Sequence, residues 1–432
     1  MTASLTDTRS AEHYARALAY MPGGVNSPVR AMRSIGRDPI FVDRAEGAEL
    51  IDVDHNRYVD WVCSWGPLVH GHAHPDIVAA IVDAAQRGTT FGAPTAAEVD
   101  LAIEVCKRMP GVQMLRMTSS GTEASMSAIR LARAVTGRTK ILKFAGAYHG
   151  HVDGLLAEAG SGLATQGIPA SPGVPVEVAA TTIVVPWNDA AALDAALEQH
   201  EFAAILAEPY PANMGLVLPA EGFLELLRAR ADDNGALLIF DEVISGFRVA
   251  PGGVQGLRGV LPDLTVMGKV IGGGLPAAAY GGPREHMRRI APAGDVYQAG
   301  TLSGNPLAVA AGLATLTLLD GEQPYVKLAA TTAALADGLR GAAETAGYED
   351  IQIATAPGLL TVFFSAEPVT DYEGAKACDL DAYAAWCRGL LARGVYPPAS
   401  QFEAWFPSLA HTPEHVARTV AAATAAFAEI GA

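Results

Sequence analysis

The segment ALLIFDEVISGFR, residues 236–248, decides the fold class of this chain. Its first five residues form a continuous apolar run that ends at the carboxylate of Asp241, which is typical of a buried strand. Further strand candidates are KILKF (140–144), TTIVVP (181–186) and AAILAE (203–208), and alanine-rich helical patterns alternate with short β-branched runs between about 75 and 320. This alternation predicts βαβ units, and therefore an α/β domain with a parallel sheet.

The regions on either side of this domain have a different texture. Residues 40–63 alternate apolar and polar side chains, which suggests short antiparallel strands with turns near Gly47 and Asn56. Helices are expected at 123–135 and 305–318, and after 320 we expect a helical stretch, strands near 351–364 and two further helices. We therefore predict an N-terminal segment (1–68) packing with a small domain, a large domain (69–315) and a C-terminal α+β domain (316–432).

Composition excludes several classes of protein. The chain has 432 residues, of which 50% are hydrophobic, so it is long enough for two or three domains. Its formal net charge of −16 disfavours a nucleic-acid or anionic-membrane partner, because such surfaces require clustered positive charge. No apolar run approaches the length of a membrane span, and the N-terminus lacks the order of a secretory signal.

Cysteines and histidines give no support for a metal site. The four cysteines have no CxxC spacing, which speaks against disulfides and a thiolate zinc site and makes a reduced cytoplasm the expected location. His70, His72 and His74 alternate in VHGHAHP, but Gly71 and Pro75 make a turn as plausible as a strand. We expect no metal.

Lys269 differs from the other five lysines, which are Lys107, Lys140, Lys143, Lys327 and Lys376. It follows the apolar run LTVMG and precedes VIGGGLPAAAYGG, which places it at the end of a buried strand beside glycine-rich backbone. A partly desolvated lysine has a lowered pKa, and its neutral amine can form a Schiff base. The alternative is a lysine at a strand end that points to water.

Asp241 ends a second buried strand, and ligands of open parallel sheets bind at the carboxyl ends of strands. A buried carboxylate can keep a pyridinium nitrogen protonated, although an aspartate there can also cap the next helix. A third junction opens the helical pattern of 119–137, where Ser120, Gly121 and Thr122 suit a phosphate or form an ordinary N-cap. Tyr148 follows KILKF and can stack on a flat cofactor. Together these features predict a pyridoxal-phosphate site.

The motifs at these junctions resemble those of one family. SSGTEA, YHGH, FDEVISGFR, GKVIGGGLP and AGTLSGNP are similar to motifs of the class III (omega-type) aminotransferases, which are fold-type I pyridoxal-phosphate enzymes, and the resemblance covers nearly the whole chain. It implies a large domain with a mixed, mostly parallel sheet, a smaller α+β domain, and pyridoxal 5'-phosphate or pyridoxamine 5'-phosphate as cofactor.

Other motifs resemble one branch of that family. These are PGGVNSPVRA (22–31), SWGP (64–67), GHAHP (71–75), NMG (213–215) and SQFEAWF (400–406). The branch carries out an intramolecular amino transfer that converts glutamate-1-semialdehyde into 5-aminolevulinate by way of 4,5-diaminovalerate, in tetrapyrrole biosynthesis. The departures from the usual motifs, such as Ser119 in place of asparagine, put fine substrate preference in question and leave the reaction type in place.

The resemblance also implies roles for individual residues. Lys269 would hold the cofactor and shuttle protons, and Asp241 would partner the pyridine nitrogen; Glu403 is the third expected catalytic residue. The other implied cofactor ligands are Ser120, Gly121, Thr122, Tyr148 and Val243, with Thr301 donated by the neighbouring subunit of a homodimer. The implied substrate ligands are Ser27 and Arg30, which would clamp a carboxylate, with Trp65, Asn213 and Glu403 lining the pocket. Residues 150–175, rich in Gly, Ser, Ala and Pro, coincide with the family's gating loop.

Three alternatives compete with this interpretation. An omega-aminotransferase acting on two separate substrates would share Lys269 and Asp241 but would require an added keto acid. A non-catalytic ligand-binding protein on the same scaffold is disfavoured, because Lys269, Asp241, Tyr148 and Arg30 occur together. A dinucleotide oxidoreductase is excluded, since no GxGxxG follows the first predicted strand with an acidic residue at the ribose distance.

Overall fold

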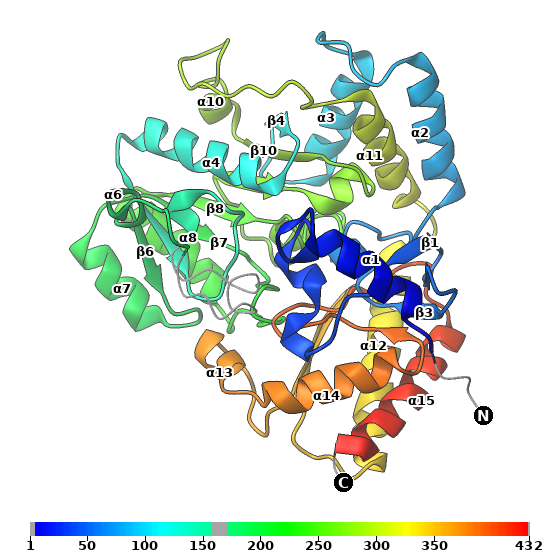
Figure 1. Ribbon diagram of the computed structural model, residues 1–432. Helices are drawn as coiled ribbons and strands as arrows, with labels where there is room; N and C mark the ends of the chain where they lie inside the picture. The colour runs from blue at the N-terminus through cyan, green and yellow to red at the C-terminus, as the bar shows by residue number, and fades with distance from the viewer. Residues whose placement is uncertain (1–4, 157–170, 431–432) are drawn as a thin grey trace.

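The computed structural model describes residues 5–156 and 171–430 of the chain. Its central element is a seven-stranded sheet of order β4-β10-β9-β8-β7-β5-β6 (Figure 1). The strands are β4 (Met114–Thr118), β5 (Lys140–Phe144), β6 (Thr182–Val185), β7 (Phe202–Ala207), β8 (Leu237–Asp241), β9 (Leu264–Met267) and β10 (Ala278–Gly282). The strands expected at 140–144, 181–186, 203–208 and 236–243 are therefore confirmed.

Strand direction brings the ends of six strands to one edge of the sheet. β10 pairs antiparallel with both β4 and β9, and the pairs from β9 to β6 are all parallel. Six strands consequently share one direction, and β10 alone runs against them. The expected mixed, mostly parallel sheet is confirmed, and the carboxyl ends of β4, β5, β7, β8 and β9 meet at a common edge.

The strands are apolar throughout because both faces of the sheet are covered. All six residues of β7 are buried. On one face Ile205 packs with side chains of α7 (Ala190–Gln199) and α8 (Phe223–Asn234), and on the other Leu206 packs with α4 (Gly121–Thr136). Full burial of each such leucine or isoleucine contributes about 1.5–3 kcal/mol.

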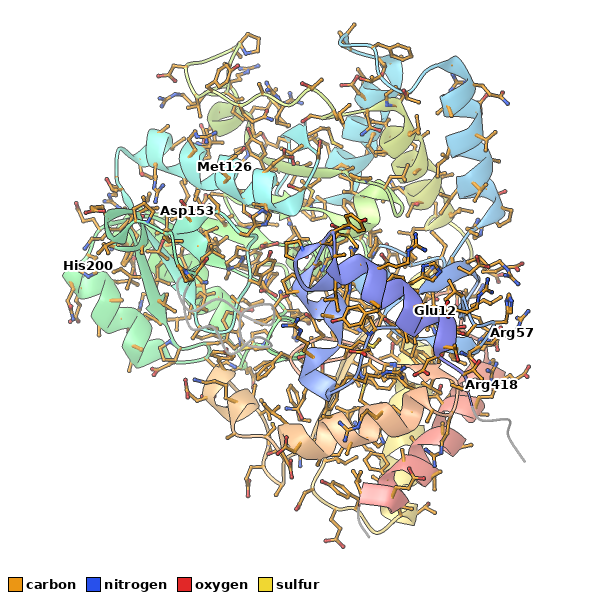
Figure 2. The ribbon with its side chains drawn as sticks, viewed as in Figure 1. Glu12, Arg57, Met126, Asp153, His200 and Arg418 are labelled. Carbon is orange, nitrogen blue, oxygen red and sulfur yellow. The ribbon has the colours of Figure 1, made fainter. Side chains whose placement is uncertain are left out.

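The N-terminal segment and the C-terminal third share a second sheet. β1 (Val42–Glu46), β2 (Glu49–Asp52) and β3 (Arg57–Asp60) pair antiparallel, which confirms the short strands expected within 40–63, and β13 (Val395–Tyr396) then pairs parallel with β3. Glu49 of β2 forms ion pairs with Arg57 and with Arg418 of α15 (Pro413–Ile430), the two arginines labelled near one another in Figure 2.

The remaining elements complete the layers around the two sheets. The helix expected at 305–318 is α11 (Pro306–Leu318), and the strands expected near 351–364 form a hairpin. Three helices follow that hairpin where two were expected, because the short α13 precedes the longer pair. The other elements are α1 (Thr8–Leu18), α2 (Pro75–Arg87), α3 (Ala96–Arg108), α6 (Val176–Ala179), α9 (Gly253–Arg258), α10 (Arg284–Met287), α12 (Pro324–Thr345), β11 (Gln352–Ala356), β12 (Leu359–Phe363), α13 (Tyr372–Lys376) and α14 (Leu380–Leu391).

In Figure 1, α12, α14 and α15 lie together on one side of the molecule, while α4 and α7 lie with the large sheet. The domain boundaries at 68 and 315 remain predictions. Within the described residues, no helix has the length and apolar character needed to cross a membrane.

Candidate active site

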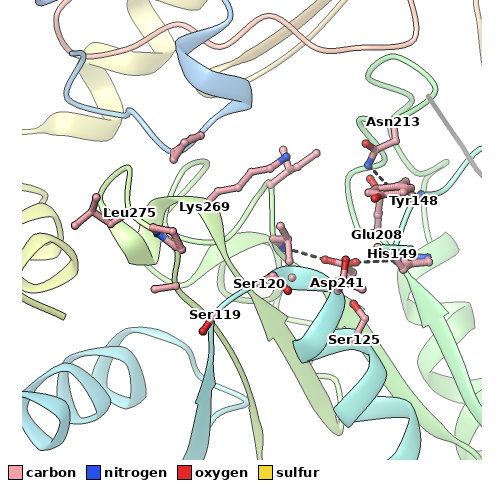
Figure 3. A pocket seen from close by; sticks show the side chains of 18 of the residues that line it. Ser119, Ser120, Ser125, Tyr148, His149, Glu208, Asn213, Asp241, Lys269 and Leu275 are labelled. Atoms are coloured by element: carbon pink, nitrogen blue, oxygen red, sulfur yellow. Dashed lines mark hydrogen bonds and ion pairs between the residues drawn. The ribbon is translucent and has the colours of Figure 1, made fainter. Parts of the chain in front are cut away.

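A cavity of about 300 Å³ opens at the carboxyl edge of the large sheet (Figure 3). It is bounded by residues that follow β4, β5, β7, β8 and β9. Eight of the residues selected from the sequence line it: Ser120, Gly121, Thr122, Tyr148, Asn213, Asp241, Val243 and Lys269. Since these residues are scattered over 150 positions of the chain, their meeting in one cavity is a property of the fold.

Lys269 begins the short 3-10 helix η6 (Lys269–Gly272), two residues after β9 ends. Its φ of 48° is left-handed, a conformation that non-glycine residues rarely adopt and that often marks functional sites. The side chain extends into the cavity (Figure 3), where burial lowers the pKa of the amine. The nearby carboxylates of Glu403, Glu208 and Asp241 oppose that shift. Burial prevails, so the neutral amine is favoured relative to a free lysine.

Asp241 is held at the floor of the cavity by two contacts. One carboxylate oxygen accepts the N–H of Val243 at 3.0 Å, and the other lies 2.7 Å from Nδ1 of His149. The side chain therefore does not cap the next helix, α9, which excludes that alternative. His149 is itself 1% exposed, and among the described residues its Nε2 has no hydrogen-bond partner. His149 thus orients the carboxylate, a role that the sequence did not reveal.

Glu208 is a second residue that the sequence analysis missed. It directly follows β7 and is buried, and burial raises the pKa of its carboxyl group. Its oxygens accept the backbone N–H groups of Tyr148 (2.8 Å) and Ala212 (3.0 Å) and the side-chain amide of Asn213 (2.9 Å). One carboxylate therefore fixes two walls of the cavity, those that carry Tyr148 and Asn213.

The start of α4 forms an anion-binding end of the cavity. Ser120 is the N-cap of α4, and with Glu123 it forms a capping box that satisfies the N–H groups of residues 119, 120 and 123. Among the described residues, the N–H groups of Gly121 and Thr122 have no acceptor, and the buried hydroxyl of Ser125 in the next turn has no partner. Unpaired donors at a helix N-terminus favour an anionic group, such as a phosphate.

The donor set therefore fits pyridoxal phosphate. The α4 terminus can hold a phosphate, Asp241 can face a protonated ring nitrogen, and Lys269 can react with an aldehyde. Val243 lines the same cavity and lies against the backbone of Gly268, where an added Cβ would come within 3.1 Å of it. That apolar side chain can contact one face of a flat ring.

Five residues expected at the site do not line this cavity. Glu403 is buried in the C-terminal part of the chain, close enough for its charge to raise the pKa of Tyr148, after the larger effect of burial. Trp65, in η4 (Cys63–Trp65), packs on the core beside Gly66, where an added Cβ would lie 3.5 Å from Lys269. Ser27 and Arg30 lie at η2 (Pro28–Ala31), where Arg30 is exposed.

Thr301 lies in a separate hollow, lined by residues 90–95, 98, 300, 301 and 303–306. Residues 157–170 of the expected gating loop fall outside the described residues. Two of the histidines considered as metal ligands make other contacts, since His72 pairs with Asp60 at 2.7 Å and His70 bonds the carbonyl oxygen of Thr315.

A lysine, a carboxylate and an anion-binding helix terminus at the carboxyl edge of this sheet define an amine-transferring enzyme of the pyridoxal-phosphate class. Residues 32–421 match the model of the family described as aminotransferase class-III, and the chain belongs to that family.

Its relatives carry a narrower name. The chain is 53% identical over 427 residues, 98% of its own length and 99% of the relative's, to a glutamate-1-semialdehyde 2,1-aminomutase of Desulfitobacterium hafniense. Among solved structures it is similar to an omega-transaminase from Sphaerobacter thermophilus, with a TM-score of 0.90, 33% identity and 98% of each chain covered. It is also similar to a glutamate-1-semialdehyde-aminomutase variant from Pseudomonas aeruginosa in complex with PMP, with a TM-score of 0.87, 29% identity and coverage of 98% and 94%.

Proposed function

We propose that this enzyme converts glutamate-1-semialdehyde into 5-aminolevulinate by intramolecular amino transfer, with pyridoxal phosphate and pyridoxamine phosphate as the two forms of its cofactor. The meeting of Lys269, Asp241 and the α4 terminus in one cavity supports amino transfer. The choice of substrate is supported by relatives of that name that align over nearly the whole chain.

Bound pyridoxal phosphate supplies an aldehyde and an electron-withdrawing ring. Lys269 would carry protons between the cofactor and the substrate carbons, as a base when its amine is neutral and as an acid when it is an ammonium. Asp241, oriented by His149, would supply negative charge to the ring nitrogen. Ser120, Gly121 and Thr122 would hold the phosphate, and Tyr148 and Val243 would contact the ring.

The substrate side of the site is proposed from the family resemblance. Ser27 and Arg30 bind the substrate carboxylate, for which the arginine offers two parallel donors. Trp65, Asn213 and Glu403 line the substrate pocket; Asn213 is held by Glu208, and Glu403 lies near Lys269 and Tyr148. The product differs from the substrate only in the positions of its amine and carbonyl, and 4,5-diaminovalerate is the intermediate that must stay bound.

We also propose a homodimer in which Thr301 reaches the phosphate of the partner's site. Thr301 is exposed in the single chain, the large apolar side chain of Phe91, 53% exposed, lines the same hollow, and Leu302, 52% exposed, directly follows Thr301 in the chain. Exposed apolar side chains of this size are typical of subunit interfaces. The cytoplasm is the proposed location, supported by four free cysteines.

The test is multiple turnover without any second substrate. Purified protein loaded with pyridoxamine phosphate is incubated with glutamate-1-semialdehyde alone, and 5-aminolevulinate is assayed. We expect many turnovers per site, abolished in Lys269→Ala and retained in Lys140→Ala. Lys140 is a matched control, because it starts β5 at the opposite edge of the sheet, where its amine lies 2.9 Å from Nδ1 of His200.

A two-substrate aminotransferase is the second candidate, because an omega-transaminase is among the solved structures with the most similar fold. It predicts no product from glutamate-1-semialdehyde alone and amine transfer once a keto acid is added. That result would reject the mutase and keep the assignment of Lys269.

A further inference from the structure

Arg248 is a buried cation without a carboxylate partner in the described part of the chain. Its side chain is 0% exposed, and no ion pair with it occurs there. A buried charge without a counter-ion costs free energy, which hydrogen bonds to the guanidinium offset in part. The pKa of the guanidinium is lowered by burial to about 10, so it stays positively charged at neutral pH.

The guanidinium donates only to backbone carbonyl groups, and these come from three separate segments. It bonds Gly66 after η4, Gly358 between β11 and β12 at 3.2 Å, and Pro407 at 3.0 Å. A Cβ added at Gly66 would lie 3.5 Å from the Lys269 side chain, and Pro407 follows Phe406, whose ring centroid lies 5.9 Å from the Lys269 amine. Arg248 therefore ties together the two segments that enclose Lys269.

The charge of Arg248 also reaches Lys269. The guanidinium lies 5.3 Å from the centroid of the Phe406 ring, so this ring stands within reach of both cations. Both distances are measured to the centroid of the Phe406 ring, so the Arg248 guanidinium and the Lys269 amine are at most about 11 Å apart. Among the described residues, the charged groups with the largest effect on the Lys269 amine are the carboxylates of Glu403, Glu208 and Asp241 and the guanidinium of Arg248.

We propose that Arg248 is a positioning residue for Lys269: it holds the Gly66 and Phe406 walls against the lysine side chain, and its charge favours the uncharged amine. The inference rests on the proposed role of Lys269 and not on the identity of the amine that is transferred. An uncharged side chain at position 248 could fill the same space, but it would not favour the uncharged amine of Lys269.

The experiment follows the visible absorbance of pyridoxal phosphate bound to the full-length protein as a function of pH. The group that titrates is the nitrogen that links Lys269 to pyridoxal phosphate. Removing the positive charge of Arg248 stabilises the protonated form of this nitrogen, so the pH at the midpoint of the titration should rise. For unit charges about 11 Å apart at an effective dielectric constant of about 20, the rise is about one pH unit in Arg248→Gln. Arg248→Lys keeps the charge and should titrate close to the wild-type midpoint, although it loses the forked contacts.

A second variant covers the case in which Arg248→Gln does not fold. Arg248→Met removes the charge and keeps a long apolar side chain at this buried position beside the Phe406 ring. It should raise the midpoint in the same direction.

Arg138→Gln is the matched control, since Arg138 also donates to two backbone carbonyls but lies at the opposite edge of the sheet. Its midpoint should equal that of the wild type. Wild-type midpoints in both Arg248→Gln and Arg248→Met would overturn this inference alone. The proposed function predicts that the wild type has a visible absorbance band and that Lys269→Ala lacks this band. If the wild type has no such band, the proposed function fails together with this inference.

Discussion

Replacing His149 by phenylalanine removes the partner of Asp241 and keeps a ring of similar size in a buried position. The structure shows one hydrogen bond of 2.7 Å between this histidine and the carboxylate, and no other partner for the ring among the described residues. A hydrogen bond to a charged group contributes about 1.5–3 kcal/mol. If all of it serves to keep the Asp241 carboxylate oriented toward the ring nitrogen, the Kd of pyridoxal phosphate rises about 10- to 150-fold.

The assay is a fluorescence titration of apoenzyme with pyridoxal phosphate at neutral pH. His72→Phe is a matched control, because His72 also lies 2.7 Å from a buried carboxylate, that of Asp60, outside the cavity. It should lose similar stability on heating and keep the wild-type Kd. The reasoning fails if folded His149→Phe binds the cofactor as tightly as the wild type, or if His72→Phe weakens binding equally.

Three further predictions follow from the same structure. Ser120→Ala removes the N-cap of α4 and should destabilise the protein by about 0.5–2 kcal/mol, measured by thermal unfolding, while Ser120→Asn should retain most of that stability. Glu403→Gln removes a carboxylate that favours protonated Lys269, so the pH below which the apoenzyme ceases to react with pyridoxal phosphate should fall; an unchanged profile would contradict this. Phe240→Ala, at a side chain 0% exposed in β8, should cost about 3–5 kcal/mol in denaturant unfolding, and a loss below 1 kcal/mol would show that the core collapses around the gap.

The sequence predicted those strands whose composition matches their burial. β7 and β8 are continuous apolar runs because both faces of each are covered, and they were placed correctly. β10 was missed, since AAYGG has few of the β-branched residues that mark strands, and small residues are required there because an added Cβ at Gly282 would lie 2.3 Å from a backbone oxygen. Close packing in β10 therefore requires glycine and alanine in place of the β-branched residues by which strands are usually predicted.

The residues of the site also fall into those that the sequence predicted and those that it did not. Lys269 and Asp241 were found because each follows an apolar run, and Glu208 follows β7 in the same manner, so the signal that identified Asp241 was also present for Glu208. His149 lies in the YHGH motif after the same strand as Tyr148, but its role was missed because its partner Asp241 lies 92 positions away in sequence. Arg248 looks like an ordinary polar residue after a strand, and only the fold shows that it is buried among carbonyl groups.

The parallel pairing of β13 with β3 bears on how the chain is made. Val59 and Asp60 are synthesised long before Val395 and Tyr396, their partners. Until those partners have been made, the edge of β3 that they pair with exposes backbone donors and acceptors to any other extended chain. Completion of this sheet therefore requires a contact between segments far apart in sequence, and contacts of that kind form slowly.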